Sequence, residues 1–203
     1  MIALVDYGAG NVRSVQKALT AAGGDVRLAS TPDKVAQADA VVLPGVGAFD
    51  DCINAMQRQE LVESIREFIA SGKPFLGICV GYQALFEKSE EFNSCSSGMD
   101  VFEGKVIRFS GKGIKIPQIG WNQVNIQKPD CPIFDGVDSG SYFYFVHSYF
   151  PEPRDSSIVA SRTTYGVEFC SAIWKGNVFA TQFHPEKSQK AGIKLLVNFV
   201  GLI

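Results

Sequence analysis

The chain is 203 residues long, carries a formal net charge of −2 and has an isoelectric point near 5.7. This length suffices for one well-cored α/β domain and is short for two, so we expect a single domain over residues 1–203. The weakly acidic charge offers no basic surface for nucleic acid, and no apolar run approaches the roughly 20 residues that span a bilayer. The amino terminus lacks the basic start and the length of a signal peptide. We therefore expect a cytoplasmic protein that binds neither nucleic acid nor membrane.

Strands and helices alternate in the first half of the sequence. Apolar runs predict strands near residues 1–6, 25–29, 40–43 and 74–78. Helical spacing predicts helices near residues 11–22, 49–57, 60–71 and 81–88. Asn11 is placed to cap the first helix. This alternation indicates an α/β fold with a central, mostly parallel sheet that is covered by helices on both faces.

The second half changes to a strand-rich pattern. Extra antiparallel strands and hairpins are predicted at residues 101–102, 105–109, 114–119, 123–126, 142–149, 158–163, 169–174 and 178–183. One hairpin turns at residues 175–177, and a helix near residues 188–202 ends the pattern.

The five cysteines show no paired spacing that would indicate a disulfide framework or a zinc site; they are Cys52, Cys79, Cys95, Cys131 and Cys170. We expect reduced thiols, no metal and no cofactor. Gly8 and Gly10 follow the first strand, but Arg13 occupies the third glycine position of a dinucleotide-binding motif.

Cys79 is the first candidate for a catalytic residue. It lies between Gly77 and Gly81, directly after a predicted strand, and a helix is predicted to follow it. A nucleophile at such a tight turn is forced toward positive φ, at a cost of about 1–3 kcal/mol, and neighbours without a Cβ relieve the crowding. The helix start favours the thiolate. The alternative is a buried cysteine that packs as a small apolar residue.

A second candidate motif is His184-Pro185-Glu186. Proline favours extended backbone before it, and residues two apart in extended backbone point the same way. Glu186 is therefore placed to orient the His184 ring as the base for Cys79. The alternative is an ordinary surface turn. His147, the other histidine of the chain, is the rival general base, but no carboxylate is placed to orient it.

Residues 44–47, Pro-Gly-Val-Gly, follow a predicted buried strand and form a candidate oxyanion hole. Glycines allow backbone N–H groups to turn toward a ligand. The donors would be Val46 or Gly47, together with Val80 after the nucleophile. The alternative is a tight turn that opens the next helix.

These motifs together resemble the class I (triad-type) glutamine amidotransferases. The matching stretches are residues 44–47, residues 77–83 (Gly-Ile-Cys-Val-Gly-Tyr-Gln) and residues 183–188 (Phe-His-Pro-Glu-Lys-Ser), and the resemblance covers nearly the whole chain. Residues 6–11, 44–49, 117–122 and 146–149 are similar to one branch of that family, the glutaminase subunits of imidazole glycerol phosphate synthases in histidine biosynthesis. The resemblance implies a flavodoxin-like fold. A polar stretch at residues 92–98 is less typical of the family.

The resemblance further implies that L-glutamine is hydrolysed to glutamate and ammonia through a γ-glutamyl thioester on Cys79. The ammonia would pass to a (β/α)₈-barrel cyclase subunit, the partner in a heterodimer, where it reacts with a phosphorylated ribulosyl aminoimidazole carboxamide nucleotide. The products are imidazole glycerol phosphate and an aminoimidazole carboxamide ribotide.

Further residue roles follow from the resemblance alone. Contacts to glutamine would come from Gly45, Gln83, His147, Ser148 and Tyr149. The partner interface would lie near Tyr7, Asn11, Asn122 and Lys187.

Three other interpretations remain open. In the first, the chain is another class I amidotransferase, such as the glutaminase of anthranilate or pyridoxal phosphate synthesis, which shares the triad. The partner that stimulates the chain would separate these enzymes. A related cysteine hydrolase or peptidase would need no partner. In a non-catalytic interaction protein, Cys79, His184 and Glu186 would be incidental.

Overall fold

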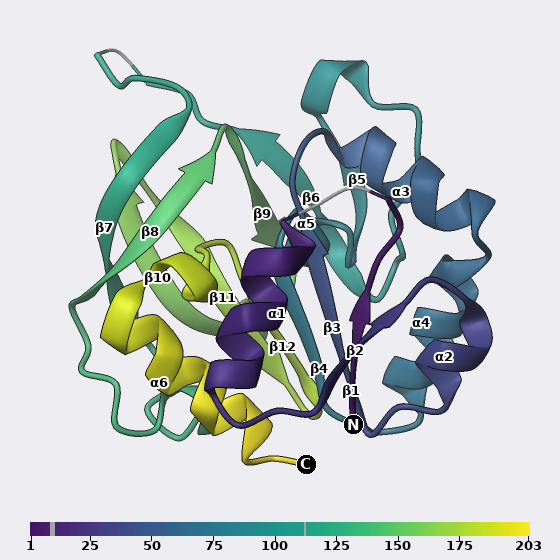
Figure 1. The fold of residues 1–203 in the computed structure, drawn as a ribbon. Coiled ribbons are helices and arrows are strands. Elements are labelled where there is room, and N and C mark those ends of the chain that lie inside the picture. Colours follow the sequence, from purple (N-terminus) through teal and green to yellow (C-terminus); the bar gives the residue numbers. More distant parts are fainter. Residues whose placement is uncertain (9–10, 112) are drawn as a thin grey trace.

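The computed structural model describes residues 1–8, 11–111 and 113–203 (Figure 1). Five parallel strands form one half of a nine-stranded sheet, in the order β2-β1-β3-β4-β12. Their bounds are β1 (Ile2–Val5), β2 (Val26–Ala29), β3 (Ala40–Gly45), β4 (Phe75–Cys79) and β12 (Val178–Thr181). β1, β3, β4 and β12 are buried along their whole length, as continuous apolar strands covered on both faces should be.

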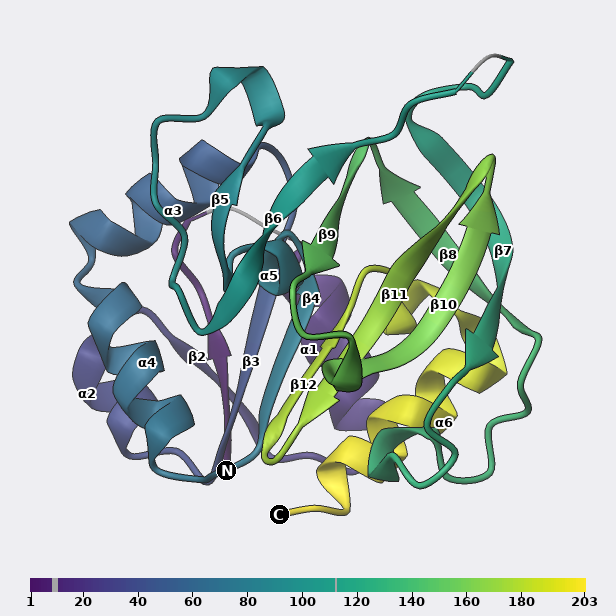
Figure 2. The same cartoon turned by 180° about the vertical axis from the view of Figure 1, so that it is seen from behind.

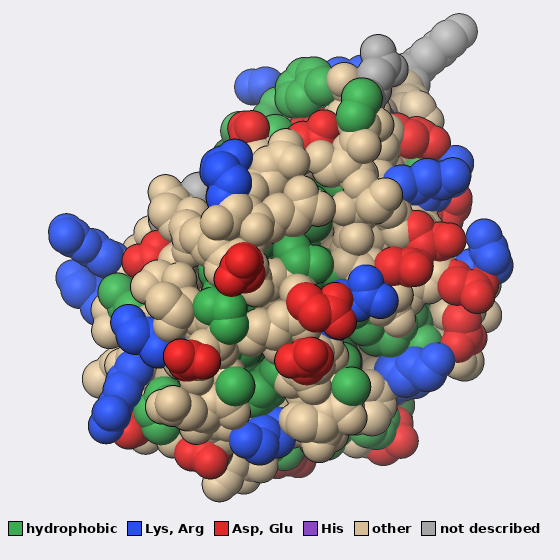
Figure 3. Space-filling model, turned by 90° about the vertical axis from the view of Figure 1, so that its right-hand side faces the viewer, with side chains coloured by type: hydrophobic (Ala, Val, Ile, Leu, Met, Phe, Trp, Pro, Cys, Tyr) green, Lys and Arg blue, Asp and Glu red, His purple; other side chains and the backbone are tan. Residues whose placement is uncertain are grey.

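Helices cover both faces of this parallel half. Helix α1 (Val12–Ala21) and helix α6 (Gln189–Val200) lie together on one face (Figure 1). The other face carries α2 (Pro32–Ala36), α3 (Phe49–Arg58) and α4 (Leu61–Ala70) (Figure 2). Acidic and basic side chains intermingle with scattered hydrophobic ones over the side of the molecule seen in Figure 3. The predicted mostly parallel α/β half, with its helices on both faces, is confirmed.

Four antiparallel strands extend the sheet in the order β11-β10-β7-β8. They are β7 (Gln118–Ile126), β8 (Ser141–His147), β10 (Val159–Tyr165) and β11 (Val167–Lys175). The predicted hairpin at residues 175–177 joins β11 to β12. The strand predicted to start at residue 114 starts at Gln118 instead, as β7.

A separate three-stranded sheet was not predicted. It consists of β5 (Phe86–Ser89), β6 (Phe102–Arg108) and β9 (Tyr149–Pro153). The predicted helix at residues 81–88 is wrong, because helix α5 covers only Val80–Gln83 and the chain then enters β5. The apolar side chains that suggested a helical face, among them Phe86, are buried instead in the core beneath this small sheet.

Two further details correct the sequence interpretation. Helix α2 was not predicted, since its five residues are too few to show helical spacing. Asn11 occupies the N-cap position of α1 as expected, but its side chain makes no capping hydrogen bond to the helix. Among the described residues, no helix is long and apolar enough to cross a membrane.

Candidate active site

Cys79 ends strand β4 and immediately precedes helix α5. Its backbone has φ of 55° and ψ of −110°, a conformation that residues with a Cβ rarely adopt. Such backbone strain costs of the order of 1–3 kcal/mol and persists only where the surrounding structure enforces it. The predicted tight strand-to-helix turn with positive φ is therefore present at Cys79, at the carboxyl edge of the parallel strands where α/β folds place their ligands.

The flanking glycines permit close backbone packing around this elbow. A Cβ added to Gly81 would lie 2.0 Å from the Leu43 carbonyl oxygen, and one added to Gly77 would lie 2.9 Å from the Gly81 carbonyl oxygen. Gly45 pairs with Cys79 across β3 and β4, and a Cβ on it would lie 2.5 Å from the Gly81 nitrogen. The three glycines let the ends of β3 and β4 pack against the first turn of α5.

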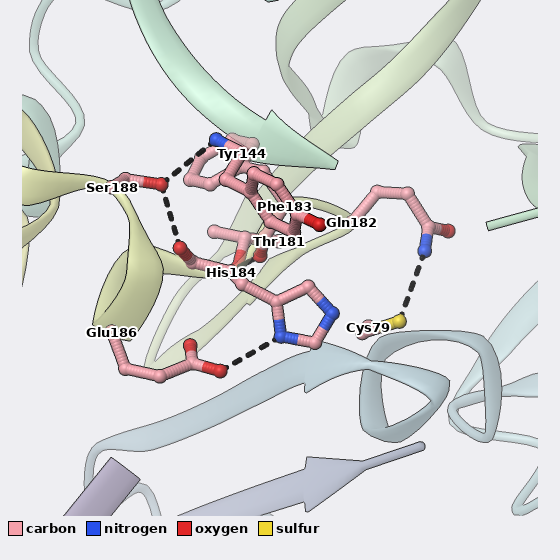
Figure 4. Close-up of polar contacts among 8 residues, drawn as sticks. All are labelled: Cys79, Tyr144, Thr181, Gln182, Phe183, His184, Glu186 and Ser188. Carbon is pink, nitrogen blue, oxygen red and sulfur yellow. Dashed lines mark hydrogen bonds and ion pairs between the residues drawn. The ribbon is translucent and has the colours of Figure 1, made fainter. Parts of the chain in front are cut away.

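His184 follows β12, the strand adjacent to β4, and so lies beside Cys79. Its Nδ1 is 2.8 Å from Glu186 Oε1, and both side chains are almost completely buried. Cys79 and Glu186 lie on opposite sides of the imidazole ring (Figure 4). Among the described residues Nε2 has no hydrogen-bond partner, which leaves it available on the side of Cys79. The predicted Cys79, His184 and Glu186 come together in the order that a triad requires.

The charges around His184 favour its protonated form. Burial by itself would lower the pKa of His184, but the neighbouring Cys79 sulfur and the Glu186 carboxylate outweigh it and raise the pKa to about 10. His184 therefore carries a proton at neutral pH. A cationic imidazole next to a cysteine is the setting in which reactive cysteines are generally found.

Strand β8 holds the backbone of His184 in place. The His184 N–H donates to the Tyr144 carbonyl oxygen at 2.9 Å. Ser188 Oγ donates to the His184 carbonyl oxygen at 2.6 Å and accepts from the Tyr144 N–H at 3.0 Å (Figure 4). His184 is thus tied to the antiparallel half of the sheet through β8, whereas Cys79 belongs to β4 in the parallel half.

His147, the rival base, does not fit that role. Its Nδ1 is 2.8 Å from the Tyr149 carbonyl oxygen, which can only accept, so Nδ1 carries the proton. Its ring packs among Phe109, Phe145 and Phe169. Burial lowers the pKa of His147 to about 3. His147 therefore stays neutral over the physiological range and is too weakly basic to serve as the general base.

A pocket of about 300 Å³ opens above Cys79 and His184, a size suited to a small-molecule ligand. The predicted oxyanion donors Val46, Gly47 and Val80 line it. So do four of the residues predicted to contact glutamine, namely Gln83, His147, Ser148 and Tyr149. Gly45 does not line the pocket but lies behind it, against Gly81.

The residues predicted at a partner interface occupy different environments. Tyr7 is only 2% exposed and donates to the Pro44 carbonyl oxygen, so it supports the loop at residues 44–47 from below instead of facing a partner. Asn11 is half-buried before α1, whereas its neighbours Ala9 and Gly10 lie outside the described residues. Asn122 donates to the Thr164 carbonyl oxygen. Lys187 lines the pocket mouth, with its Nζ 5.7 Å from the centre of the Tyr144 ring.

Two residues of the site were missed in the sequence analysis. Glu91 begins the short 3₁₀ helix (Glu91–Asn93) after β5, lines the pocket and accepts a 2.7 Å hydrogen bond from the Phe49 N–H at the start of α3. Gln182 is fully buried and reaches the Cys79 sulfur. Gln182 could have been found by the alternation that linked His184 to Glu186, because it lies two residues before His184. Nothing in the sequence brings Glu91 to the pocket, since a loop's path is not set by periodicity.

Comparison with known proteins gives a consistent result. The model of the family described as glutamine amidotransferase class-I matches residues 3–201. The imidazole glycerol phosphate synthase subunit HisH of Syntrophotalea carbinolica is 51% identical, with 98% of each chain covered. The subunit of the same name from Geobacter sulfurreducens is 48% identical, with 98% of this chain and 97% of the relative covered.

Solved structures of low sequence identity share the fold. PurLQS from Thermotoga maritima superimposes with a TM-score of 0.75 at 20% identity, over 98% of this chain and 96% of the other. The glutaminase domain of Trypanosoma brucei CTPS gives 0.71 at 15% identity, over 99% and 91%. At such identities the likeness shows the fold alone. The family model and the full-length relatives show that the chain belongs to the class I glutamine amidotransferase family, in its branch of imidazole glycerol phosphate synthase HisH subunits.

Proposed function

We propose that this chain is the glutaminase subunit of an imidazole glycerol phosphate synthase and acts as one glutamine amidotransferase domain. The observation that carries the proposal is the strained Cys79 beside a buried His184 that is held by Glu186 at 2.8 Å. Together with the pocket above them, these groups suit attack on the carboxamide of L-glutamine. The full-length relatives named as subunits of that synthase support the pathway.

In the first half-reaction the Cys79 thiolate attacks the carboxamide carbon of glutamine. Negative charge develops on the carbonyl oxygen, and backbone N–H groups of Val46 or Gly47 and of Val80 stabilise it. Protonated His184 then donates its Nε2 proton to the departing nitrogen. The carbon–nitrogen bond breaks, ammonia leaves, and a γ-glutamyl thioester remains on Cys79.

In the second half-reaction neutral His184 accepts a proton from a water molecule that attacks the thioester carbon. The carbon–sulfur bond breaks, glutamate forms and the thiolate is restored beside a protonated His184. Glu186 holds the ring orientation in both halves, since its carboxylate accepts a hydrogen bond from Nδ1–H whether His184 is neutral or cationic.

The pocket lining supports recognition of glutamine as an amino acid. Gln83 and the backbone of residues 147–149 would contact the bound substrate, with Gly45 shaping the pocket from behind. Glu91 brings a carboxylate to the pocket, and burial raises its pKa above the ordinary range. We assign it to the α-ammonium group of glutamine, because an ammonium is the part of the substrate that a carboxylate binds best.

A barrel-type cyclase subunit is the partner that we propose. Ile119 and Trp121 of β7 and Tyr142 of β8 lie on the same face of the sheet and are 61%, 45% and 56% exposed. Val146 of the same face lines the pocket, so this apolar face continues to the pocket mouth beside Lys187. Large exposed apolar side chains next to an active site are typical of a protein interface. A partner docked there would receive the ammonia where it forms.

The oxyanion loop offers a means of control by that partner. Gly47 has φ of 93°, a conformation from which a glycine peptide reorients at little cost. We propose that the partner, loaded with its nucleotide, turns an N–H of this loop toward the substrate. The isolated chain should then hydrolyse glutamine poorly.

The test is glutamate release from L-glutamine by the purified chain, alone and with a cyclase subunit of an imidazole glycerol phosphate synthase and its nucleotide ligand. Strong stimulation by the loaded cyclase, and its loss in Cys79→Ala, is the expected result. Glutaminase activity that the loaded cyclase does not change would support the proposed hydrolysis of glutamine but assign the chain to a different synthase.

The four buried free thiols Cys52, Cys79, Cys131 and Cys170 support the cytoplasm as the location of the protein.

A further inference from the structure

Gln182 is a buried polar residue that contacts Cys79. The mechanism above gives it no role. Its Nε2 donates to Cys79 Sγ at 3.6 Å, on the side of the sulfur away from Glu186 (Figure 4). Gln182 is 0% exposed, and its backbone N–H is held by the Ser171 carbonyl oxygen at 2.8 Å. The side chain is therefore enclosed by protein, with its amide nitrogen directed at the sulfur.

The hydrogen bonds around Gln182 fix which end of its amide faces Cys79. Gln83 Nε2 is 3.0 Å from the Tyr149 carbonyl oxygen, which can only accept, so this end of the Gln83 amide is the nitrogen. The same nitrogen donates its second hydrogen to Gln182 Oε1 at 3.1 Å. The oxygen of Gln182 must therefore face Gln83, and its NH₂ group must face Cys79. The chain of amides ends in an N–H donor aimed at the sulfur.

The titratable groups around Cys79 keep a fixed charge near pH 7. Among the described residues, Cys79 contributes to the pKa shifts of Tyr7, Cys52 and His184. Burial raises the pKa of Tyr7 far above its ordinary range and that of Cys52 to about 12, so both are neutral near pH 7. His184 is cationic there. Gln182 is thus the neutral donor that complements His184 on the same thiolate.

We propose that Gln182 is a further catalytic residue, an N–H donor that stabilises the Cys79 thiolate both before attack and as it leaves from the thioester. The proposal rests on the proposed glutaminase function. When the thioester is hydrolysed, water adds to the carbonyl carbon, His184 takes one proton of that water and the carbon–sulfur bond breaks. The electron pair of that bond stays on sulfur, where the Gln182 N–H receives it. Gln83 is the positioning residue that keeps the Gln182 amide in the required orientation.

Two substitutions of Gln182 separate the effect of its N–H donor from the effect of its side-chain volume. Gln182→Glu keeps an oxygen that accepts from Gln83 Nε2 but removes the N–H donor and adds a negative charge. Gln182→Met removes the donor with a similar volume and no charge. Ser161→Ala is the matched control, because it removes another buried hydrogen bond, to Ser171 Oγ at 2.9 Å, and Ser161 lies on β10, two strands away from β12.

The experiment measures the rate at which iodoacetamide alkylates Cys79 as a function of pH, read on the peptide that contains Cys79. We expect the pH of half-maximal rate to rise by about 1 unit in Gln182→Met and by more in Gln182→Glu, because a hydrogen bond to a charged acceptor is lost. Ser161→Ala should match the wild type. With glutamine and the loaded cyclase, Gln182→Met should lower kcat about tenfold, leave KM nearly unchanged and accumulate the thioester in acid-quenched samples.

The outcomes are distinguishable. If both Gln182 variants alkylate and turn over as the wild type does, Gln182 is only a structural residue and the inference is overturned. A shift that Ser161→Ala shares would overturn it as well. If the wild type releases no glutamate under any condition while the alkylation shift is still seen, the contact to the sulfur stands and the proposed glutaminase function fails.

Discussion

The pKa of His184 tests the electrostatics of the site, because two separate negative groups are responsible for its rise. Cys79→Ala removes one of them and leaves Glu186 in contact with Nδ1. In this variant only the Glu186 carboxylate raises the pKa of His184, and burial still lowers it. We expect the pKa of His184 to fall by about 1–3 units in this variant, the usual effect of one opposite charge at close range.

The rise from 6.5 to about 10 corresponds to about 5 kcal/mol of preferential stabilisation of the cationic ring. A group whose pKa is raised in the folded state contributes stability that is fully present below its unfolded pKa and is lost as the pH rises through its folded pKa. The wild type should therefore lose unfolding free energy between about pH 6.5 and 10 relative to His184→Gln. Cys79→Ala should lose less over that range.

The assay is NMR of the chain with isotope-labelled histidine. Only two histidines give signals, and His147 stays neutral down to about pH 3, so the titration above pH 4 belongs to His184. Cys52→Ala is the matched control, because it removes a buried thiol whose pKa of about 12 keeps it uncharged. The reasoning is refuted if His184 of the wild type titrates near 6.5, or if Cys52→Ala lowers its pKa as much as Cys79→Ala does.

Three more predictions concern packing, substrate binding and partner binding. Gly81→Ala should destabilise the chain by at least about 3 kcal/mol in denaturant unfolding, because its Cβ would overlap a backbone oxygen. Gly72 has positive φ but open space around it, so Gly72→Ala should lower the free energy of unfolding by only about 1–2 kcal/mol. Glu91→Gln should raise KM for glutamine about tenfold or more with little change in kcat, whereas Glu90→Gln, an exposed neighbour paired with a lysine, should leave both unchanged. Trp121→Ala should weaken binding to the cyclase about 30-fold in calorimetry without changing the melting temperature, and an unchanged affinity would move the interface elsewhere.

The nucleophile elbow could be predicted from sequence because its determinants are local. An apolar strand, two glycines and Cys79 define the geometry within seven residues, and the structure has the expected positive φ. The pairing of His184 with Glu186 was predictable for the same reason, since one proline sets the local backbone. Each of these features depends on residues that are neighbours in the chain.

The features that were missed depend on distant parts of the chain. The helix predicted at residues 81–88 stops at Gln83, because β5 pairs with β6, whose strand begins at Phe102. The resemblance placed Tyr7 near a partner interface, but its side chain is buried and its hydroxyl donates to the Pro44 carbonyl oxygen of another strand. Periodicity and local propensity contain no information about such partners.

The central claim is that glutamine hydrolysis passes through a covalent intermediate on Cys79. The most direct measurement is mass spectrometry of the chain after acid quench during turnover of glutamine with the loaded cyclase. We expect a γ-glutamyl group on the peptide that contains Cys79 and none in Cys79→Ala. Steady release of glutamate with no such adduct, and with activity retained in Cys79→Ala, would contradict the claim.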